Sequence, residues 1–338
     1  MKKKNWLALL LVGAIATTSF QSCSKDDDET VTGDTGPVEW TRSTVAPEDP
    51  REGAASFVIN DQAYMVGGIT SLPSSTRLND AWAFNGSQWE PRAEFAGGVR
   101  NSAVGFAIGN AGYVGTGYDG ETALNDFYRF DSASNTWTKI ADFPGTPRVE
   151  ATAFSLGGFG YVGLGRTVGG RTFSDMYRYD PSNDTWTLVP TQFGWTRTGA
   201  FAFVIGDRAY IGGGSFNNQL PEDFFSFDGT TWTKLNDLNR SDADQTYDVR
   251  RFNTSTFVIG GMGYIVSGRG PAGLVANVWK YNPATDVWTN EHQAIQGAGA
   301  REKAIGFALG NRGFISTGSN GTGVSSFFNE TLVFTPVR

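Results

Sequence analysis

The chain of 338 residues carries 34 acidic and 27 basic side chains, a net charge of −7 that disfavours a nucleic-acid partner. Its single histidine and single cysteine exclude a histidine-based zinc or copper site and a disulfide within the chain, so neither a metal nor another cofactor is expected. A hydrophobic share of 39%, with 44 glycines and 10 tryptophans, indicates a folded domain with many tight turns.

The first 22 residues are predicted to be a signal peptide. Lysines at positions 2 to 4 precede an apolar run of about 11 residues, and small residues then lead to Cys23. This run is too short to span a bilayer comfortably. Cys23 resembles the acylated cysteine of bacterial lipoproteins, although Phe20 stands where leucine is usual. The resemblance implies that Cys23 is the lipid anchor of an exported lipoprotein.

Residues 23–37 are predicted to form an acidic, flexible tether, because they are rich in Asp, Thr and Gly and poor in apolar residues. Their first part, from Ser24 to Glu29, resembles the acidic stretch that directs some lipoproteins of Gram-negative bacteria to the cell surface. This resemblance implies a location in the outer membrane, exposed at the cell surface and held by the lipid alone.

From residue 38 onward, one sequence unit recurs six times at intervals of 48 to 54 residues. Each copy has a phenylalanine six residues after an arginine, an aromatic residue thirteen after it and a glycine seventeen after it. A fixed period of this size indicates a repeat architecture. The arginines that define the copies are Arg51, Arg100, Arg148, Arg197, Arg251 and Arg301.

Each copy predicts four strands and no helix. The first is a short apolar run rich in small residues, such as AASFVI, which is typical of a strand buried on both faces. The second ends in glycine, as in AYMVGG. The third alternates aromatic residues, as in AWAF, and the fourth is centred on a tryptophan that is usually followed by threonine.

Sheets that are apolar on both faces must stack on one another, and a closed ring removes the exposed end faces. The sixth copy ends without its tryptophan, whereas Trp40 stands 49 residues before Trp89, which is one repeat length. We therefore predict an all-β, six-bladed β-propeller over residues 38–338, in which the strand around Trp40 completes the sixth blade.

The recurring glycine, the Asp-x-aromatic element and the closing Trp-Thr pair resemble kelch repeats over roughly residues 38–338. The usual Gly-Gly doublet survives only at Gly67-Gly68 and Gly213-Gly214, while other copies have pairs such as Leu164-Gly165. The resemblance implies four-stranded blades of the kelch type. Galactose oxidase, the best-known enzyme with such blades, needs copper held by two histidines, so its chemistry is excluded here. Asp242 and Asp244 lack the glycine and glutamate of an EF-type calcium loop, and they predict a solvated acidic loop.

Two functions remain open from the sequence. The first is a non-catalytic binding scaffold at the cell envelope, a monomer whose ligand is an acidic glycan or protein. The second is a sugar enzyme, because residues 143–148 (FPGTPR) are similar to a segment of the bacterial N-acetylneuraminate epimerases. Exchange of a proton at an anomeric centre needs a positioned acid and base. His292, Glu52, Glu150 and Glu302 are the candidates for those roles. The alternative is that His292 is an ordinary loop residue and the glutamates are surface charges.

Eight arginines and two aromatic residues are the candidate ligand-binding residues. In an antiparallel blade the chain enters the first strand and leaves the second at the same end, so the arginines and the residues after the strand-two glycines share one face. Kelch domains that bind acidic partners use arginines at such positions. An alternative is that the six repeated arginines are structural and bond loop carbonyls or the acids of a neighbouring blade. The candidates are Arg51, Arg100, Arg148, Arg166, Arg197, Arg251, Arg269 and Arg301, with Tyr118 and Trp195 as stacking surfaces.

Overall fold

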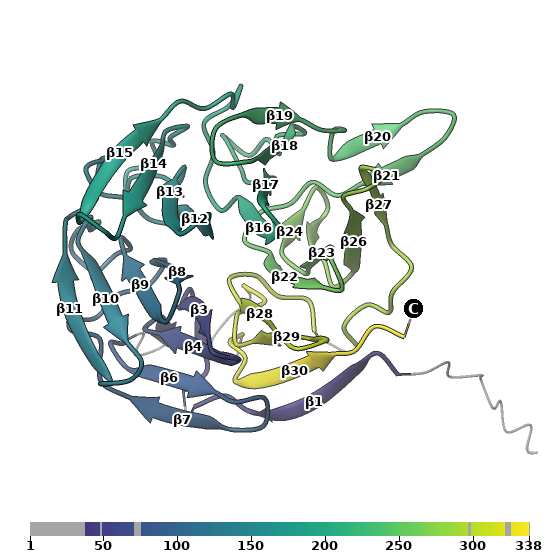
Figure 1. Ribbon diagram of the computed structural model, residues 1–338. Helices are drawn as coiled ribbons and strands as arrows, with labels where there is room; N and C mark the ends of the chain where they lie inside the picture. The colour runs from purple at the N-terminus through teal and green to yellow at the C-terminus, as the bar shows by residue number, and fades with distance from the viewer. Residues whose placement is uncertain (1–37, 48, 71–75, 297–298, 322–325, 338) are drawn as a thin grey trace, which may run out of the picture. The chain divides into compact units, whose positions relative to one another are not determined.

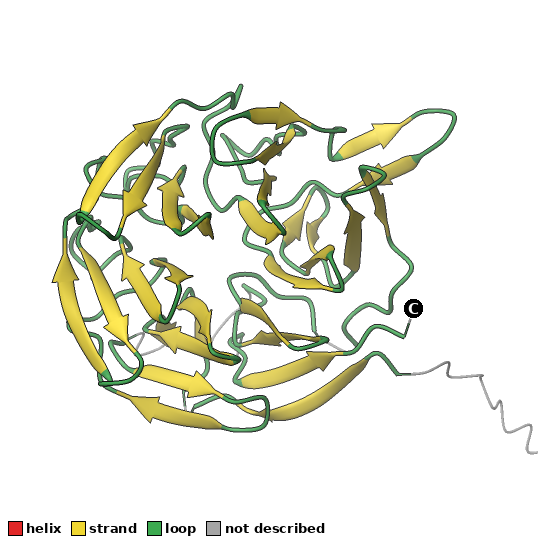
Figure 2. Cartoon of the chain, viewed as in Figure 1, coloured by secondary structure: helices red, strands yellow, loops and turns green. Residues whose placement is uncertain are grey.

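The computed structural model describes residues 38–47, 49–70, 76–296, 299–321 and 326–337. These residues form strands, turns and loops, and no helix occurs among them (Figure 2). Six four-stranded antiparallel sheets follow one another around a ring (Figure 1). The predicted all-β, six-bladed propeller is therefore confirmed. The predicted signal peptide, the tether and Cys23 lie outside the described residues.

In each blade the four strands lie side by side, with the first strand at the centre of the ring and the last at its rim (Figure 1). The inner strands are β3 (Ala55–Ile59), β8 (Val104–Ile108), β12 (Thr152–Leu156), β16 (Phe201–Ile205), β22 (Ser255–Ile259) and β28 (Ile305–Leu309). The second strands are β4 (Gln62–Val66), β9 (Ala111–Gly115), β13 (Phe159–Gly163), β17 (Arg208–Gly212), β23 (Met262–Val266) and β29 (Arg312–Ser316). The third strands are β6 (Ala81–Phe84), β10 (Phe127–Asp131), β14 (Met176–Asp180), β18 (Phe224–Phe227), β26 (Val278–Asn282) and β30 (Glu330–Phe334). The outer strands are β7 (Trp89–Arg92), β11 (Thr136–Ile140), β15 (Thr185–Val189), β19 (Trp232–Lys234), β27 (Val287–Thr289) and β1 (Trp40–Val45).

Six shorter strands form three two-stranded ribbons outside the blades. They pair β2 (Arg51–Glu52) with β5 (Ile69–Thr70), β20 (Asn239–Ser241) with β21 (Thr246–Asp248), and β24 (Arg269–Gly270) with β25 (Gly273–Leu274). The β20–β21 hairpin corresponds to the predicted solvated acidic loop. Its turn is closed by the Asp242 carboxylate, which accepts hydrogen bonds from the backbone N–H groups of Asp244 and Gln245 at 2.9 Å each.

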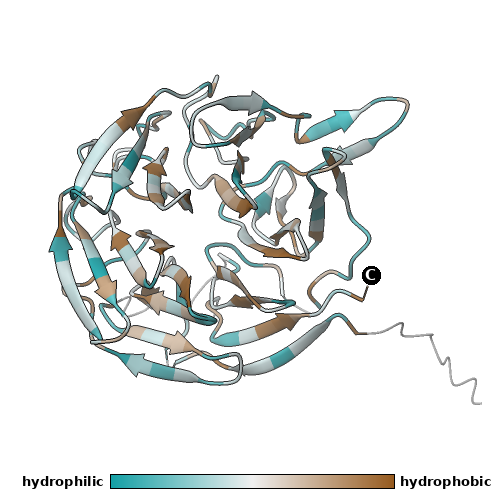
Figure 3. Ribbon diagram, in the orientation of Figure 1, coloured by the Kyte–Doolittle hydropathy of each residue, from teal (hydrophilic) through white to brown (hydrophobic). Residues whose placement is uncertain are grey.

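The inner strands differ from the sequence prediction in one respect. We expected both of their faces to be buried, but in β3, β12, β22 and β28 buried residues alternate with half-buried ones. The reason is that one face of each inner strand lines a central channel, which the sequence pattern does not reveal. Hydrophobic segments nevertheless concentrate in the inner strands, while the outer strands are mostly pale or hydrophilic (Figure 3).

Stacked aromatic rings hold the first two strands of each blade together. Phe57 lies opposite Tyr64 in blade one, with ring centroids 4.9 Å apart, and the equivalent pairs of the other blades are 5.0 to 5.5 Å apart. The same phenylalanine reaches the next blade, where a Cβ added to Gly112 would lie 2.2 Å from its ring. Glycine at this position therefore lets neighbouring blades approach closely.

The ring closes through the N-terminal strand, as predicted. β1 pairs with β30, and Trp40 lies directly opposite Phe334. In the other blades the tryptophan of the outer strand faces the same position of the third strand, as Trp89 faces Phe84. The indole of Trp40 donates a hydrogen bond to the carbonyl of Gln293 in the preceding blade at 2.9 Å. Trp40 is thus the missing tryptophan of the sixth copy.

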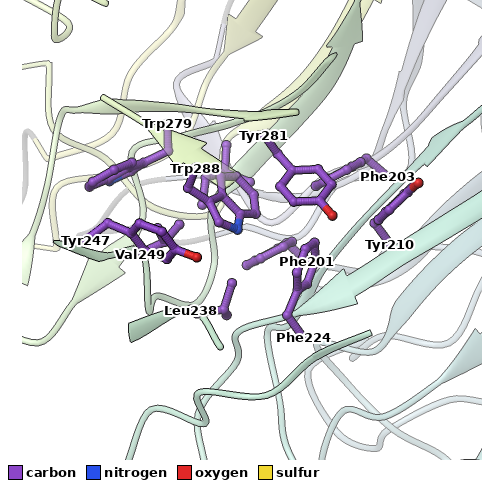
Figure 4. Close-up of a cluster of buried hydrophobic side chains, with 11 residues drawn as sticks. Phe201, Phe203, Tyr210, Phe224, Leu238, Tyr247, Val249, Trp279, Tyr281 and Trp288 are labelled. Carbon is purple, nitrogen blue, oxygen red and sulfur yellow. The ribbon is translucent and has the colours of Figure 1, made fainter. Parts of the chain in front are cut away.

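The connection between blades four and five adds its own side chains to the core. Leu238, Tyr247 and Val249, which flank or belong to the β20–β21 hairpin, join the core cluster that contains Phe224 and Trp288 (Figure 4). This segment corresponds to the longest interval between copies, 54 residues from Arg197 to Arg251. The extra residues therefore form an extension whose side chains pack into the core of the propeller.

Candidate functional site

Six residues, one from each blade, form a closed circle of backbone hydrogen bonds where the inner strands begin. Each stands two residues after a repeat arginine, and its N–H donates to the carbonyl of the equivalent residue in a neighbouring blade at 2.7 to 3.1 Å. All six have left-handed backbone angles, with φ between 51° and 64°. We call this circle the mouth ring: Gly53, Ser102, Glu150, Gly199, Asn253 and Lys303.

The mouth ring is a strained feature. Four of its members are not glycine, and a left-handed conformation costs about 1–2 kcal/mol for each such residue. Strain of this kind is found at functional sites, where the surrounding structure enforces it. The mouth ring is therefore a candidate binding site.

Behind the mouth ring lies a channel lined by small side chains. The residue after each ring member is alanine in five blades and Thr254 in the other, and these six residues border both the mouth and the channel. The cavity at the mouth measures about 180 Å³ and the deeper channel about 210 Å³. Short side chains thus leave room at the centre of the propeller.

The six repeat arginines are buried in the blades, with at most 2% of their surface exposed. In five blades the guanidinium lies 2.5 to 2.7 Å from a carboxylate of its own blade: Asp80, Asp126, Asp175, Asp223 and Glu330. In all six it also donates to the carbonyl of the residue before the strand-two glycine, at 2.9 to 3.2 Å.

These contacts decide between the two roles that the sequence left open for Arg51, Arg100, Arg148, Arg197, Arg251 and Arg301. A buried guanidinium that is already bonded has few donors left for a ligand, so these six arginines are structural. Their acids come from the same blade, not from the neighbouring one as the sequence suggested. The carbonyl that each one bonds belongs to a residue with φ between 57° and 66°, even where Thr116 or Leu164 replaces the first glycine of the doublet.

Blade five departs from the pattern. Asn277 takes the place of the carboxylate, and the guanidinium of Arg251 donates instead to the carbonyls of Ser267 and Val249. Burial lowers the pKa of Arg251 to about 10, against a smaller opposing effect of Asp248. The side-chain carbonyl of Asn277 is itself buried without a hydrogen bond. The site of the fifth acid is thus a weak point of the fold.

Glu150 is the centre of the charged groups at the mouth. Arg166 donates to both of its carboxylate oxygens, at 2.9 and 3.3 Å, and the hydroxyl of Thr198 donates to one of them at 3.0 Å. Lys303, from the opposite part of the mouth ring, lies 3.4 Å from Glu150 and 3.4 Å from Glu52. Glu150 is therefore held by three neighbours on three different segments.

Glu302 and Arg269 form a second pair at the mouth. Their charged groups are 2.6 Å apart, and Asn253 of the mouth ring donates to the other oxygen of Glu302 at 3.0 Å. Ser319 donates to Glu52, the third carboxylate, which Lys303 also approaches. These contacts bring together three carboxylates and three cations. The positive charges of Arg166, Arg269 and Lys303 are thus balanced by these glutamates.

The charges at the mouth stabilise one another. Burial by itself raises the pKa of Glu150, but the hydrogen bond from Arg166 and the charge of Lys303 outweigh it and lower the pKa below its ordinary value. Burial by itself lowers the pKa of Lys303, yet the three neighbouring glutamates raise it. Glu150 and Lys303 are therefore both ionised at neutral pH.

The remaining predicted residues lie in different places. Tyr118 directly follows the strand-two glycine of its blade, as Arg166 and Arg269 do in theirs. The guanidinium of Arg77 lies 4.5 Å from the centroid of the Tyr118 ring. Trp195 is 48% exposed and borders a separate groove. His292 is buried, bonds Glu39 through Nδ1 at 2.8 Å and packs against Phe334. His292 is thus not among the residues that line the mouth or the channel.

Sequence reasoning missed the uncharged members of the site and Lys303. Thr198, Asn253 and Ser319 bond the mouth glutamates, but none of them recurs in the repeat. Their position relative to each arginine or strand-two glycine could have indicated them. Among the described residues, no group of three or more His, Cys, Asp or Glu side chains could hold a metal ion. No helix able to cross a membrane was found in the same part of the chain.

Six four-stranded blades, a buried arginine-acid pair in nearly every blade and an outer tryptophan define a kelch-type propeller. Residues 11–214 match the family described as the KLHDC2/KLHL20/DRC7 Kelch-repeats domain, and the chain belongs to this kelch-repeat family. Among solved structures, it resembles that of YjhT with a TM-score of 0.69 and 16% identity, over 87% of this chain and 98% of the other. At this identity the likeness shows the fold alone. No curated protein sequence matches the chain.

Proposed function

We propose that this protein is a non-catalytic binding propeller of the bacterial cell envelope, whose mouth ring and adjoining charged pairs hold a glycan. The observation that carries the proposal is the network of three carboxylates and three cations at the mouth, of which Glu150 and Lys303 line the open cavity. Carboxylates accept hydrogen bonds from sugar hydroxyls, whereas guanidinium and ammonium groups donate to hydroxyl oxygens. Because these side chains already hold one another, little conformational entropy is lost when a ligand binds.

An acidic substituent on the glycan has a partner at this site. The side chains of Arg166 and Arg269 remain 33% and 37% exposed, so each can turn further donors toward a ligand carboxylate. Such charge-assisted pairs are strong and directional. A protein ligand with an acidic segment would use the same two arginines, and the experiment below separates it from a glycan.

The double variant Arg166→Ala, Arg269→Ala tests the role of the mouth. We expect the variant to remain folded, because Glu150 keeps Lys303 and Thr198 while Glu302 keeps Asn253. Binding of sialyllactose, measured by calorimetry, should weaken by about 1.5–3 kcal/mol for each lost charged hydrogen bond. Lys139→Ala, at an exposed position on an outer strand, is the control. Unchanged binding by the folded double variant would place the ligand elsewhere, and binding of acidic peptides alone would favour a protein ligand.

A second candidate function rests on the same cluster. The three glutamates that the sequence proposed as acid or base, Glu52, Glu150 and Glu302, gather around Lys303, which suits proton transfer to and from a bound sugar. The enzyme would then be a sialic-acid mutarotase or related sugar enzyme. Anomer exchange of N-acetylneuraminic acid, followed by NMR, tests this function. Acceleration that Glu150→Gln abolishes would favour the enzyme, and no acceleration would leave the binding scaffold.

The envelope location of this proposal depends on Cys23 as the lipid anchor. A single acyl chain holds a protein only weakly, so firm anchoring needs the several chains typical of lipoproteins. Mass spectrometry of membrane-extracted protein should find residue 23 as an acylated N-terminus. An unmodified Cys23 would contradict the anchor, and Cys23→Ala should release the protein from the membrane fraction.

A further inference from the structure

A groove separate from the channel mouth lies beside Trp195, where blade four meets the β20–β21 extension. Its volume is about 510 Å³, within the range of small-molecule sites. One wall is the exposed indole of Trp195, and the others carry Gln219, Glu222, Lys234 and Arg250. Asp223, the acid of the Arg197 pair, also lines the groove, but the residues named above stand outside the recurring kelch pattern, so the fold does not require them.

Trp195 is held in a fixed place although it is exposed. Its ring lies 5.7 Å from that of Phe216, and its carbonyl accepts a hydrogen bond from the buried Arg197 at 3.4 Å. Phe216 is itself fixed by two backbone hydrogen bonds with Gln219, which close a tight turn. Among the described residues, Trp195 is the one aromatic residue classed with the exposed large hydrophobic side chains, with about half of its surface open to solvent. A rigid, exposed ring of this kind contributes contact area at little loss of entropy.

The polar groups of the groove are also held in place. Arg250 is bonded by both oxygens of Asp248, at 2.8 and 2.9 Å, and it donates to Glu222 at 3.0 Å. On another wall, Lys234 and Asp237 lie 3.1 Å apart. Glu222, Lys234 and Asp237 all keep at least 40% of their side chains exposed. The groove therefore offers fixed acceptors and donors next to an aromatic surface.

This combination fits a saccharide better than other small ligands. The C–H groups on one face of a pyranose ring stack on an aromatic ring, while its hydroxyls need both donors and acceptors at the rim. The groove is lined by two acids, Glu222 and Asp237, and by two bases, Lys234 and Arg250, while a third acid, Asp223, is already paired with the buried Arg197. These opposite charges balance, so the groove has no net positive charge to attract a phosphate or carboxylate ligand. An uncharged sugar unit is the class that matches these groups.

We infer that the Trp195 groove is a saccharide-binding subsite for a neutral pyranose unit. The inference rests on the proposed function for its ligand class and adds a second place of contact. Thr198, whose hydroxyl bonds Glu150 at the mouth, stands three residues after Trp195. Three residues span at most about 11 Å between Cα atoms, so a glycan of a few units reaches both places. Its neutral unit stacks on Trp195 while its acidic unit meets Arg166.

Saturation-transfer NMR with methyl β-galactoside at millimolar concentration tests the groove alone, and calorimetry with sialyllactose tests both places. Trp195→Ala should abolish saturation transfer to the galactoside and weaken sialyllactose binding at least tenfold. Trp195→Phe should restore most of both, because the aromatic surface remains. Leu188→Ala removes another exposed apolar side chain, on β15, and serves as the control that leaves both signals unchanged.

The outcomes separate this inference from the proposed function. Loss with Trp195→Ala and no loss with the Arg166, Arg269 double variant would support the groove and contradict the mouth. The reverse pattern would overturn the groove and keep the mouth. No saturation transfer to the galactoside by the unmodified protein would also overturn the groove, as would equal effects of Trp195→Ala and Leu188→Ala.

Discussion

Replacement of Trp40 by alanine tests whether the N-terminal strand closes the ring. Trp40 is 7% exposed, its ring centroid lies 5.0 Å from that of Phe334, and its indole donates to Gln293. It belongs to a core cluster that joins Phe257 and Tyr264 of blade five to Phe334 of blade six. Its loss therefore affects the packing between two blades as well as the pairing of β1 with β30.

The expected loss can be worked from these contacts. A tryptophan of this kind buries about 200 Å². At about 25 cal/mol per Å² of apolar surface, this corresponds to an upper bound near 5 kcal/mol. The hydrogen bond to Gln293 adds about 1 kcal/mol. Measured substitutions of buried tryptophan by alanine cost about 3–5 kcal/mol, and we expect Trp40→Ala to fall in this range. For a domain of this size, the melting temperature would drop by about 5–8 °C.

Urea unfolding followed by near-ultraviolet circular dichroism measures the loss, with two matched controls. Trp232→Ala, at the same position of blade four and 6% exposed, should cost a similar amount. Trp195→Ala, at an exposed position, should change stability by less than about 0.5 kcal/mol. If Trp40→Ala behaved like Trp195→Ala, closure of the ring by β1 would be refuted. Deletion of residues 37–43 should have a larger effect than the single substitution, because it also leaves β30 as an open edge.

Three further results are expected. Burial lowers the pKa of Arg251 to about 10, and Asn277→Asp should give this arginine its missing acid and raise the unfolding free energy by about 1.5–3 kcal/mol near pH 7. Asp126→Asn creates the same gap in blade two and should lower the unfolding free energy by a similar amount. Denaturant titration checks both variants, and a destabilised Asn277→Asp would contradict this account. Gly165→Ala should lower the unfolding free energy by about 3 kcal/mol or more, because φ is +83° and the new Cβ would lie 2.8 Å from a backbone carbonyl. The control Gly158→Ala, at φ +84° but with open space around the new Cβ, should cost only about 1–2 kcal/mol. Equal losses of stability would show that the contact with the carbonyl is unimportant. Because the pKa of Glu150 is lowered in the folded state, its stabilising contribution is present above the ordinary carboxyl pKa and is lost as the pH falls through the folded-state pKa. The difference in melting temperature between the unmodified protein and Glu150→Gln should therefore narrow from pH 7 to pH 3. A constant difference would argue against the charged network.

The sequence by itself determined the architecture. Six copies at a regular interval, each with its arginine, aromatic residues and glycine, fixed the number of blades and strands, because these residues are needed at the same place in every blade. The position of Trp40, one repeat length before Trp89, was enough to identify the closing strand. A repeat can be read in this way since the contacts that build it recur with it.

Only the tertiary structure decided what the charged residues do. The sequence could not tell that Arg51 and four of its five equivalents are buried against acids of their own blades. A repeated arginine gives the same sequence pattern whether it serves structure or binding. Nor could it show that Glu150, Arg166 and Lys303 meet at one mouth while His292 lies elsewhere. Glu150 and Lys303 are 153 positions apart and come together because the blades form a closed circle. Contacts between residues that occur in only one copy of the repeat depend on how the blades are arranged in the ring. No local sequence pattern shows that arrangement.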